Sequence, residues 1–73
     1  MNNKSIYQIL AKNLKIPEDS ITLETDTNNT PEWDSLAHVR IILELEKKSK
    51  IKVENHQMGE LNSVTKLIKH FTI

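Results

Sequence analysis

The chain has 73 residues, contains no cysteine, and balances ten basic residues against ten acidic ones. A chain this short forms one domain, here residues 1–73, and buries only about 60% of the surface that its unfolded state exposes. Without cysteine, neither disulfide bonds nor thiolate zinc sites can supplement the core. The balanced charge argues against a nucleic-acid binder, which normally has a basic excess. Because the first residues lack the apolar core of a signal peptide and no segment approaches membrane-spanning length, we expect a cytoplasmic protein.

The first predicted helix begins near Ser5 and ends before Pro17. Ser5 and Gln8 have the spacing of a capping box, which marks a helix start. Four apolar residues then recur with helical spacing and predict one buried face: Ile6, Ile9, Leu10 and Leu14. Pro17 ends the helix because the residue before a proline disfavours the helical conformation.

A long connection occupies residues 16–33. Ile21 and Leu23 alternate with polar residues, but no second strand is available to pair with them, so we expect both to fasten the connection onto the helices. A polar turn is expected around Asn28 and Asn29. Connections of this length are usually functional or disordered, and this one leads directly into the next helix, which favours function. For Trp33 two roles remain open, a plug against the bundle and an exposed contact.

The second predicted helix runs from Ser35 to about residue 49. Asp34 is a suitable N-cap, because its side chain can accept a hydrogen bond from the N–H of residue 36 or 37. Ser35 is then the first helical residue, and its hydroxyl is not needed for capping. This end of the helix carries unpaired N–H groups and the positive end of the helix dipole, so it tolerates a phosphate group well. The arrangement indicates an attachment point rather than a catalytic site.

A helical wheel divides this second helix into a broad apolar arc and a narrow polar strip. The arc holds His38, Val39, Ile41, Ile42 and Leu45. The strip holds Ala37, Arg40, Glu44, Lys47 and Lys48. Leu36 and Leu43 lie between the two, near water. We expect His38 to be a hydrogen-bonded core histidine, and the spacing predicts ion pairs from Glu44 to Lys48 and from Glu46 to Lys50.

The remaining sequence predicts a short helix and a final long one. Ile51 and Val53 lie in a short extended link. Residues 54–61 can form a short helix, weakened by Gly59. Ser63 is expected to cap a last helix, whose apolar face is Val64, Leu67, Ile68 and Phe71. The expected fold is therefore all-α, a small four-helix bundle with three principal helices and one short helix.

From Asp34-Ser35-Leu36 onward the sequence resembles the acyl carrier protein family. Matching residues follow at Val39, Ile41, Ile42, Leu45, Glu46, Ile51, Val53, Ser63, Val64, Leu67, Ile68 and Phe71. The tripeptide alone is a weak signal, but its place at the start of a central helix in a chain of this length is much more specific. The resemblance implies that Ser35 is esterified with 4′-phosphopantetheine from coenzyme A, whose thiol carries a substrate as a thioester. It also implies that Asp34, besides capping, helps to hold the Mg²⁺ used by the modifying transferase.

The resemblance implies a carrier and not an enzyme. A serine hydroxyl is a poor nucleophile without a base, and no histidine can be placed beside Ser35, so no catalytic residue is expected. The histidines His38, His56 and His70 are too scattered for a metal site. The implied partners are a phosphopantetheinyl transferase and acyl- or aminoacyl-loading and acyl-transfer enzymes. We expect no nucleic-acid or membrane partner, and we expect the carrier to be a monomer.

Several positions depart from carriers of fatty-acid synthesis, whose second helix is strongly acidic. Here the polar strip mixes both charges, Pro31-Glu32-Trp33 replaces a glycine-containing turn, and Ser49 stands where an aromatic residue is frequent. The Trp-Asp-Ser-Leu variant looks like carriers of specialised pathways. An aminoacyl or peptidyl carrier and a non-enzymatic helical adaptor remain alternatives. Residues expected to contact partners are Leu36, Arg40, Leu43 and Lys47.

Overall fold

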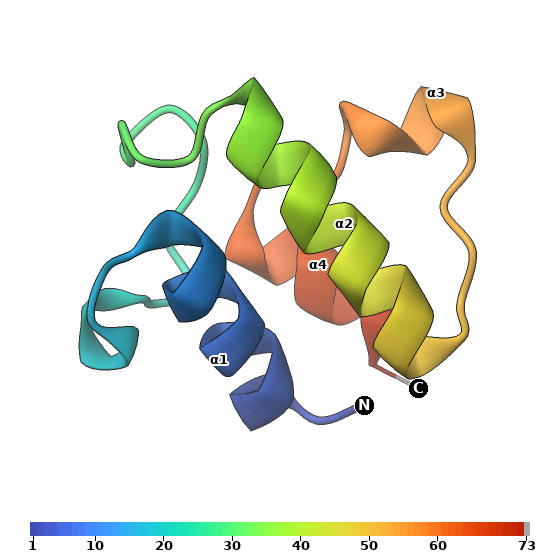
Figure 1. Ribbon diagram of the computed structural model, residues 1–73, viewed down its shortest axis with the longest axis horizontal. Helices are drawn as coiled ribbons and strands as arrows, with labels where there is room; N and C mark the ends of the chain where they lie inside the picture. Colours follow the sequence, from blue (N-terminus) through green and yellow to red (C-terminus); the bar gives the residue numbers. More distant parts are fainter. Residues whose placement is uncertain (73) are drawn as a thin grey trace.

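The computed structural model describes residues 1–72 as a small bundle of helices (Figure 1). In chain order the elements are α1 (Asn3–Leu14), the 3₁₀ helix η1 (Glu18–Ser20), α2 (Ser35–Ser49), α3 (Asn55–Met58) and α4 (Val64–Phe71). Helix α1 packs against both α2 and α4. The two ends of the described chain lie close together, since the Thr72 hydroxyl approaches Asn3 Oδ1 at 3.5 Å. The predicted all-α bundle of three principal helices and one short helix is confirmed.

The core is built mainly by aliphatic side chains from the three long helices, together with the aromatic rings of Trp33 and Phe71. The side chains that are fully buried are Ile6, Leu10, Ile41, Ile42, Leu45, Val64, Leu67 and Phe71. Each such side chain contributes about 1.5–3 kcal/mol when it leaves water. The apolar faces predicted for the first and last helices therefore hold the bundle together. Among residues 1–72, no helix is both long enough and apolar enough to span a bilayer.

Helix α1 begins earlier than the sequence indicated. The N-cap is Asn2, whose Oδ1 accepts a hydrogen bond from Ser5 N at 2.9 Å. The predicted capping box at Ser5 is wrong, because Ser5 is already helical and Asn2 supplies the capping oxygen three residues earlier. At the other end Lys15 takes the left-handed conformation, with φ of 59°, and its N–H bonds to the carbonyl of Ala11. The helix thus stops before Pro17, as predicted.

The connection 16–33 is held by hydrogen bonds to the segment that begins α4. Val64 N donates to Thr25 O at 3.0 Å, and Thr27 N donates to the carbonyl of Asn62 at 3.1 Å. Ile21 is buried as expected, but Leu23 is 56% exposed, so its predicted role as an apolar anchor is wrong. The physical reason is that backbone pairing with residues 62–64 fastens this part of the connection, and no apolar side chain is needed there.

The buried face of α2 is rotated relative to the predicted arc. Ala37, assigned to the polar strip, is buried, whereas Val39, assigned to the apolar arc, is 42% exposed. Both assignments were wrong because α1 packs on the Ala37 side of the helix, where a small side chain permits close approach. Ile41, Ile42 and Leu45 are buried as predicted.

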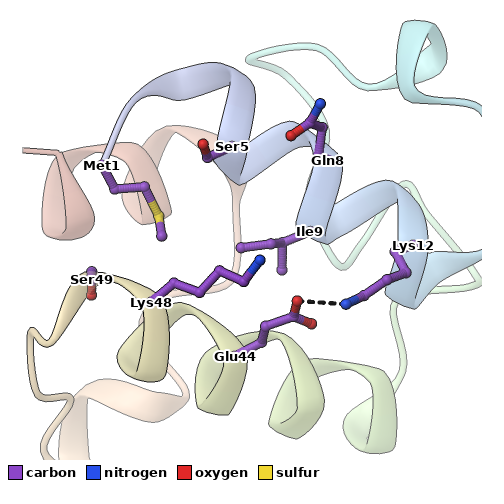
Figure 2. Close-up of a pocket in the computed structure, with 8 residues that line it drawn as sticks. All are labelled: Met1, Ser5, Gln8, Ile9, Lys12, Glu44, Lys48 and Ser49. Carbon is purple, nitrogen blue, oxygen red and sulfur yellow. Dashed lines mark hydrogen bonds and ion pairs between the residues drawn. The ribbon is translucent and has the colours of Figure 1, made fainter.

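Glu44 bonds to α1 instead of to its own helix. Its carboxylate accepts hydrogen bonds from Lys12 Nζ and from Asn13 Nδ2, the latter at 3.0 Å. The Lys12–Glu44 contact is the one ion pair within residues 1–72, so the predicted pairs with Lys48 and from Glu46 to Lys50 are wrong. Lys48 instead adds only a longer-range attraction to Glu44. Figure 2 shows Lys12, Glu44 and Lys48 in a groove of about 440 Å³ between α1 and α2.

Helix α3 is shorter than the predicted range of 54–61. It ends at Met58, with Gly59 as its C-cap, and the N–H groups of Glu60 and Leu61 then bond to the carbonyl of Gln57 and turn the chain. Leu61 is buried and Met58 packs against the core. Ser63 then caps α4 through a 3.2 Å hydrogen bond from Lys66 N, which confirms the predicted cap.

Candidate functional site: the start of helix α2

The chain enters α2 through a tight turn that is anchored by a buried indole. Trp33 N donates to Thr30 O at 2.9 Å across Pro31 and Glu32, and proline is favoured at this second position of a β-turn. The Trp33 side chain is only 3% exposed. Of the two roles left open by the sequence, Trp33 therefore has the first, and it plugs the connection against the bundle.

Asp34 caps the helix as predicted. Its Oδ1 accepts a hydrogen bond from Ala37 N at 2.9 Å, and its backbone is extended. Ser35 is the first helical residue and is exposed. Within residues 1–72 the Ser35 hydroxyl takes part in no hydrogen bond. The first N–H groups of an α-helix have no partner inside the helix, so they leave a positive end beside this hydroxyl.

Ser35 differs from the other four serines of the chain. Three of them use the hydroxyl locally: Ser20 Oγ donates to Pro17 O, Ser49 Oγ accepts from Ile51 N, and Ser63 Oγ accepts from Lys66 N. Ser5 is half-buried in the groove of Figure 2. Ser35 is therefore the serine that combines an exposed side chain with an unengaged hydroxyl in the described part of the chain.

His38 links the turn, α2 and α3. Its Nδ1 accepts a hydrogen bond from the Trp33 indole N–H at 3.0 Å, so the ring proton of the neutral form sits on Nε2. Nε2 then donates to the carbonyl of Met58 at 2.6 Å. That carbonyl ends α3 and has no helical partner. His38 is hydrogen-bonded through both ring nitrogens, as expected, but it is half-buried and not part of the core. Because both nitrogens are engaged, it does not act as a base for Ser35.

The four residues expected to contact partners lie on one exposed face. Leu36 is 70% exposed and Leu43 is 56% exposed, and Arg40 and Lys47 are also exposed. Val39 joins them at 42% exposure. We call these five residues the outer face of α2. Sequence reasoning missed Val39, although its spacing of three from Leu36 and four from Leu43 places all three on neighbouring turns.

The groove between α1 and α2, which contains Glu44, is separate from the site at Ser35. Partial burial alone would raise the pKa of Glu44. Hydrogen bonds from Lys12 and Asn13, together with the charges of Lys12 and Lys48, outweigh that effect and hold the pKa below its ordinary value. The groove lies along the half of α2 that is remote from Ser35 (Figure 2). It is a structural clamp between two helices.

A helical bundle with an exposed, unengaged serine at a helix start fits the class of carrier proteins, in which a partner enzyme modifies an exposed side chain. A comparison with protein families supports this class: the family model described as "Phosphopantetheine attachment site" matches residues 4–71. Because the match covers nearly the whole chain, the chain belongs to this family of acyl-carrier-like proteins. Its covalent cofactor is 4′-phosphopantetheine, and the protein is a non-catalytic carrier that works with a phosphopantetheinyl transferase and acyl-handling enzymes.

The residues at the start of α2 fit such a group. A phosphodiester on the Ser35 hydroxyl would lie beside the positive end of the helix, where anions are stabilised. The hydroxyl is exposed and unengaged, so modification would break no hydrogen bond within the described residues. When bound, the prosthetic group supplies a thiol, which this cysteine-free chain lacks.

Proposed function

We propose that Ser35 is the attachment residue and that the protein carries an acyl or related group as a thioester in a specialised biosynthetic pathway. The observation that carries the proposal is the exposed, unengaged hydroxyl of Ser35 at the first position of α2. In the modification, Ser35 Oγ forms a bond to the phosphorus of the pantetheinyl phosphate of coenzyme A. The bond from that phosphorus to the leaving adenosine 3′,5′-bisphosphate breaks, and the hydroxyl proton passes to a base on the transferase.

Asp34 supports this role in two ways. Its Oδ1 holds the helix start by accepting from Ala37 N. Its Oδ2 has no hydrogen-bond partner within residues 1–72 and belongs to an exposed side chain. Magnesium prefers carboxylate, phosphate and water oxygens. We therefore propose that Asp34 Oδ2 contacts the transferase-bound Mg²⁺ while Oδ1 keeps its capping role.

The assignment is tested by incubating the purified protein with coenzyme A and a broad-specificity phosphopantetheinyl transferase. Intact-protein mass spectrometry should show the addition of one phosphopantetheinyl group. Ser35→Ala should gain none, and Ser5→Ala, which alters the other serine without a hydroxyl partner, should be modified like the wild type. Modification of Ser35→Ala, or no modification of the wild type, would refute the assignment.

The nature of the cargo is a separate question from the attachment. An aminoacyl or peptidyl carrier would use the same hydroxyl, and loading assays of the modified protein with acyl-activating and amino-acid-adenylating enzymes separate the two. We favour a specialised pathway because the charged residues of the outer face, Arg40 and Lys47, are cations. Electrostatic matching governs partner choice and association rate. An enzyme adapted to an acidic second helix should therefore use this carrier poorly.

A further inference from the structure

The outer face of α2 continues into a hollow, and three of the six residues that line this hollow are lysines. The hollow has a volume of about 450 Å³ and is formed by Leu43, Glu46, Lys47, Lys50, Ile51 and Lys52. We call it the lysine-lined hollow. We propose that an enzyme acting on Ser35 docks with an apolar surface on the outer face and with carboxylate side chains in the lysine-lined hollow. This inference rests on the proposed attachment at Ser35.

The outer face lies within the area that an enzyme acting on Ser35 would cover if it approached along α2. Lys47 lies twelve residues after Ser35, about 18 Å along the helix at 1.5 Å per residue. A standard interface buries about 800 Å² on each partner, equivalent to a disc of about 16 Å radius. A disc centred on Ser35 and extending along α2 covers Leu36, Val39 and Leu43 and ends near Lys47. The hollow therefore falls at the border of the contact.

The apolar part of the contact is already exposed to water. Leu36, Val39 and Leu43 are three of the four large apolar side chains that stand exposed in residues 1–72. They occupy successive turns of one helix, whereas the fourth, Leu23, lies in the connection. A contiguous exposed apolar strip of this kind marks an interaction site.

The lysine-lined hollow is positively charged because the two acidic side chains of this part of α2, Glu44 and Glu46, are bound within the protein. Glu44 is turned towards α1, where Lys12 and Asn13 bind it. Glu46 accepts a 2.7 Å hydrogen bond from Val53 N and thereby ties the link after α2 to the helix. The exposed charged side chains of the hollow are therefore the cations Lys47, Lys50 and Lys52, and they face no ion-pair partner within the described residues.

This charge favours one occupant over two others. Carboxylates on a partner would pair with Lys47, Lys50 and Lys52 at the rim, where charges steer association. A second copy of this chain is disfavoured, because a two-fold contact would bring the same lysines of both copies together. An anionic membrane could also attract lysines, so the experiment includes it as a competing outcome.

The test uses the phosphopantetheinyl transferase of the source organism and measures kcat/KM for modification of the full chain. Lys47→Glu/Lys52→Glu should lower kcat/KM by about 10- to 100-fold through a higher KM, and the wild-type value should fall as salt is raised. Leu43→Ala should raise KM without changing the salt dependence. Lys4→Glu/Lys69→Glu makes the same charge change on exposed residues outside the face and should behave like the wild type.

Three results would overturn the inference. One is an unchanged kcat/KM for the folded Lys47→Glu/Lys52→Glu variant, with folding checked by circular dichroism. The second is a faster reaction of that variant, which would indicate a basic partner. The third is an unchanged kcat/KM together with sedimentation of the wild type, but not the variant, with phosphatidylglycerol vesicles, which would assign the hollow to a membrane. All three presuppose modification at Ser35, so failure of this inference differs from failure of the proposed function.

Discussion

The hydrogen bonds of His38 make replacement of this residue the most informative stability experiment. His38→Leu removes the acceptor for the Trp33 indole N–H and the donor to the carbonyl of Met58. Trp33 is 3% exposed, so its N–H cannot turn to water without movement of the indole. We therefore expect the substitution to loosen both the turn before Ser35 and the end of α3.

The magnitude follows from the groups left without partners. A buried polar group that loses its hydrogen bond costs about 1–3 kcal/mol, and two such groups are affected here. The added apolar surface of leucine returns about 1 kcal/mol, because this site is only half-buried. The net loss is about 1–5 kcal/mol. It is a large share of the total for a chain of 73 residues, which should lie between about 4 and 11 kcal/mol.

Urea unfolding measures this loss directly. Trp33 is the one tryptophan of the chain and reports the turn by fluorescence, while far-ultraviolet circular dichroism reports the helices. The midpoint should fall in His38→Leu with little change in the slope m. His56→Leu replaces an exposed histidine and should stay within about 0.5 kcal/mol of the wild type.

A double-mutant cycle tests the link itself. Trp33→Phe and His38→Leu each break the same hydrogen bond, so their combined effect should be smaller than the sum by about 0.5–3 kcal/mol. Strict additivity would mean that the two side chains are energetically independent. A His38→Leu variant as stable as the wild type would refute the reasoning outright.

The other predictions concern the clamp between α1 and α2, a helix end and the exposed leucines. Because the folded-state pKa of Glu44 is lowered, the ionised carboxylate stabilises the fold above about pH 4, and this stabilisation is lost as acid protonates the group. In urea titrations, Glu44→Gln should therefore lower the free energy of unfolding by about 0.5–1 kcal/mol at pH 7 and by progressively less towards pH 3. A difference between the variant and the wild type that does not change with pH would contradict this. Lys15→Gly, at the left-handed residue that ends α1, should raise stability by about 0.5–1 kcal/mol and the Tm by a few degrees. Gln8→Gly within α1 should instead lower stability by about 1 kcal/mol. A lower Tm for Lys15→Gly would contradict the prediction. Leu36→Ser should change the free energy of unfolding by less than about 0.5 kcal/mol, whereas Ile41→Ala in the core should cost about 2–5 kcal/mol; a severely destabilised Leu36→Ser would show that the outer face supports the fold.

The sequence predicts the start of a helix correctly where a nearby side chain caps that helix. Asp34 and Ser63 each cap the helix that follows from a few residues away, so the starts of α2 and α4 could be predicted without any tertiary information. The exposed position of Ser35 follows from the same local geometry. The start of α1 was misplaced because Asn2 and Ser5 are both acceptable caps, and only the folded backbone shows which of them is used.

Contacts between elements could not be predicted in the same way. The periodicity of α2 shows that one face is buried, but the exact direction of that face depends on where α1 packs. The packing of α1 leaves Val39 exposed and Ala37 buried. Glu44 has acceptable partners within its own helix and on α1, and the approach of Lys12 decided between them. The link from Trp33 through His38 to Met58 spans 25 residues of sequence and joins three segments that no local rule connects.

The sequence by itself therefore determined the helices, the capped start of α2 and the serine presented there, because capping and periodicity act within a few residues. Only the tertiary structure decided which side of α2 faces water, where its acids are bound and how the turn before Ser35 is held. These features depend on the packing of helices and on hydrogen bonds between side chains far apart in the chain.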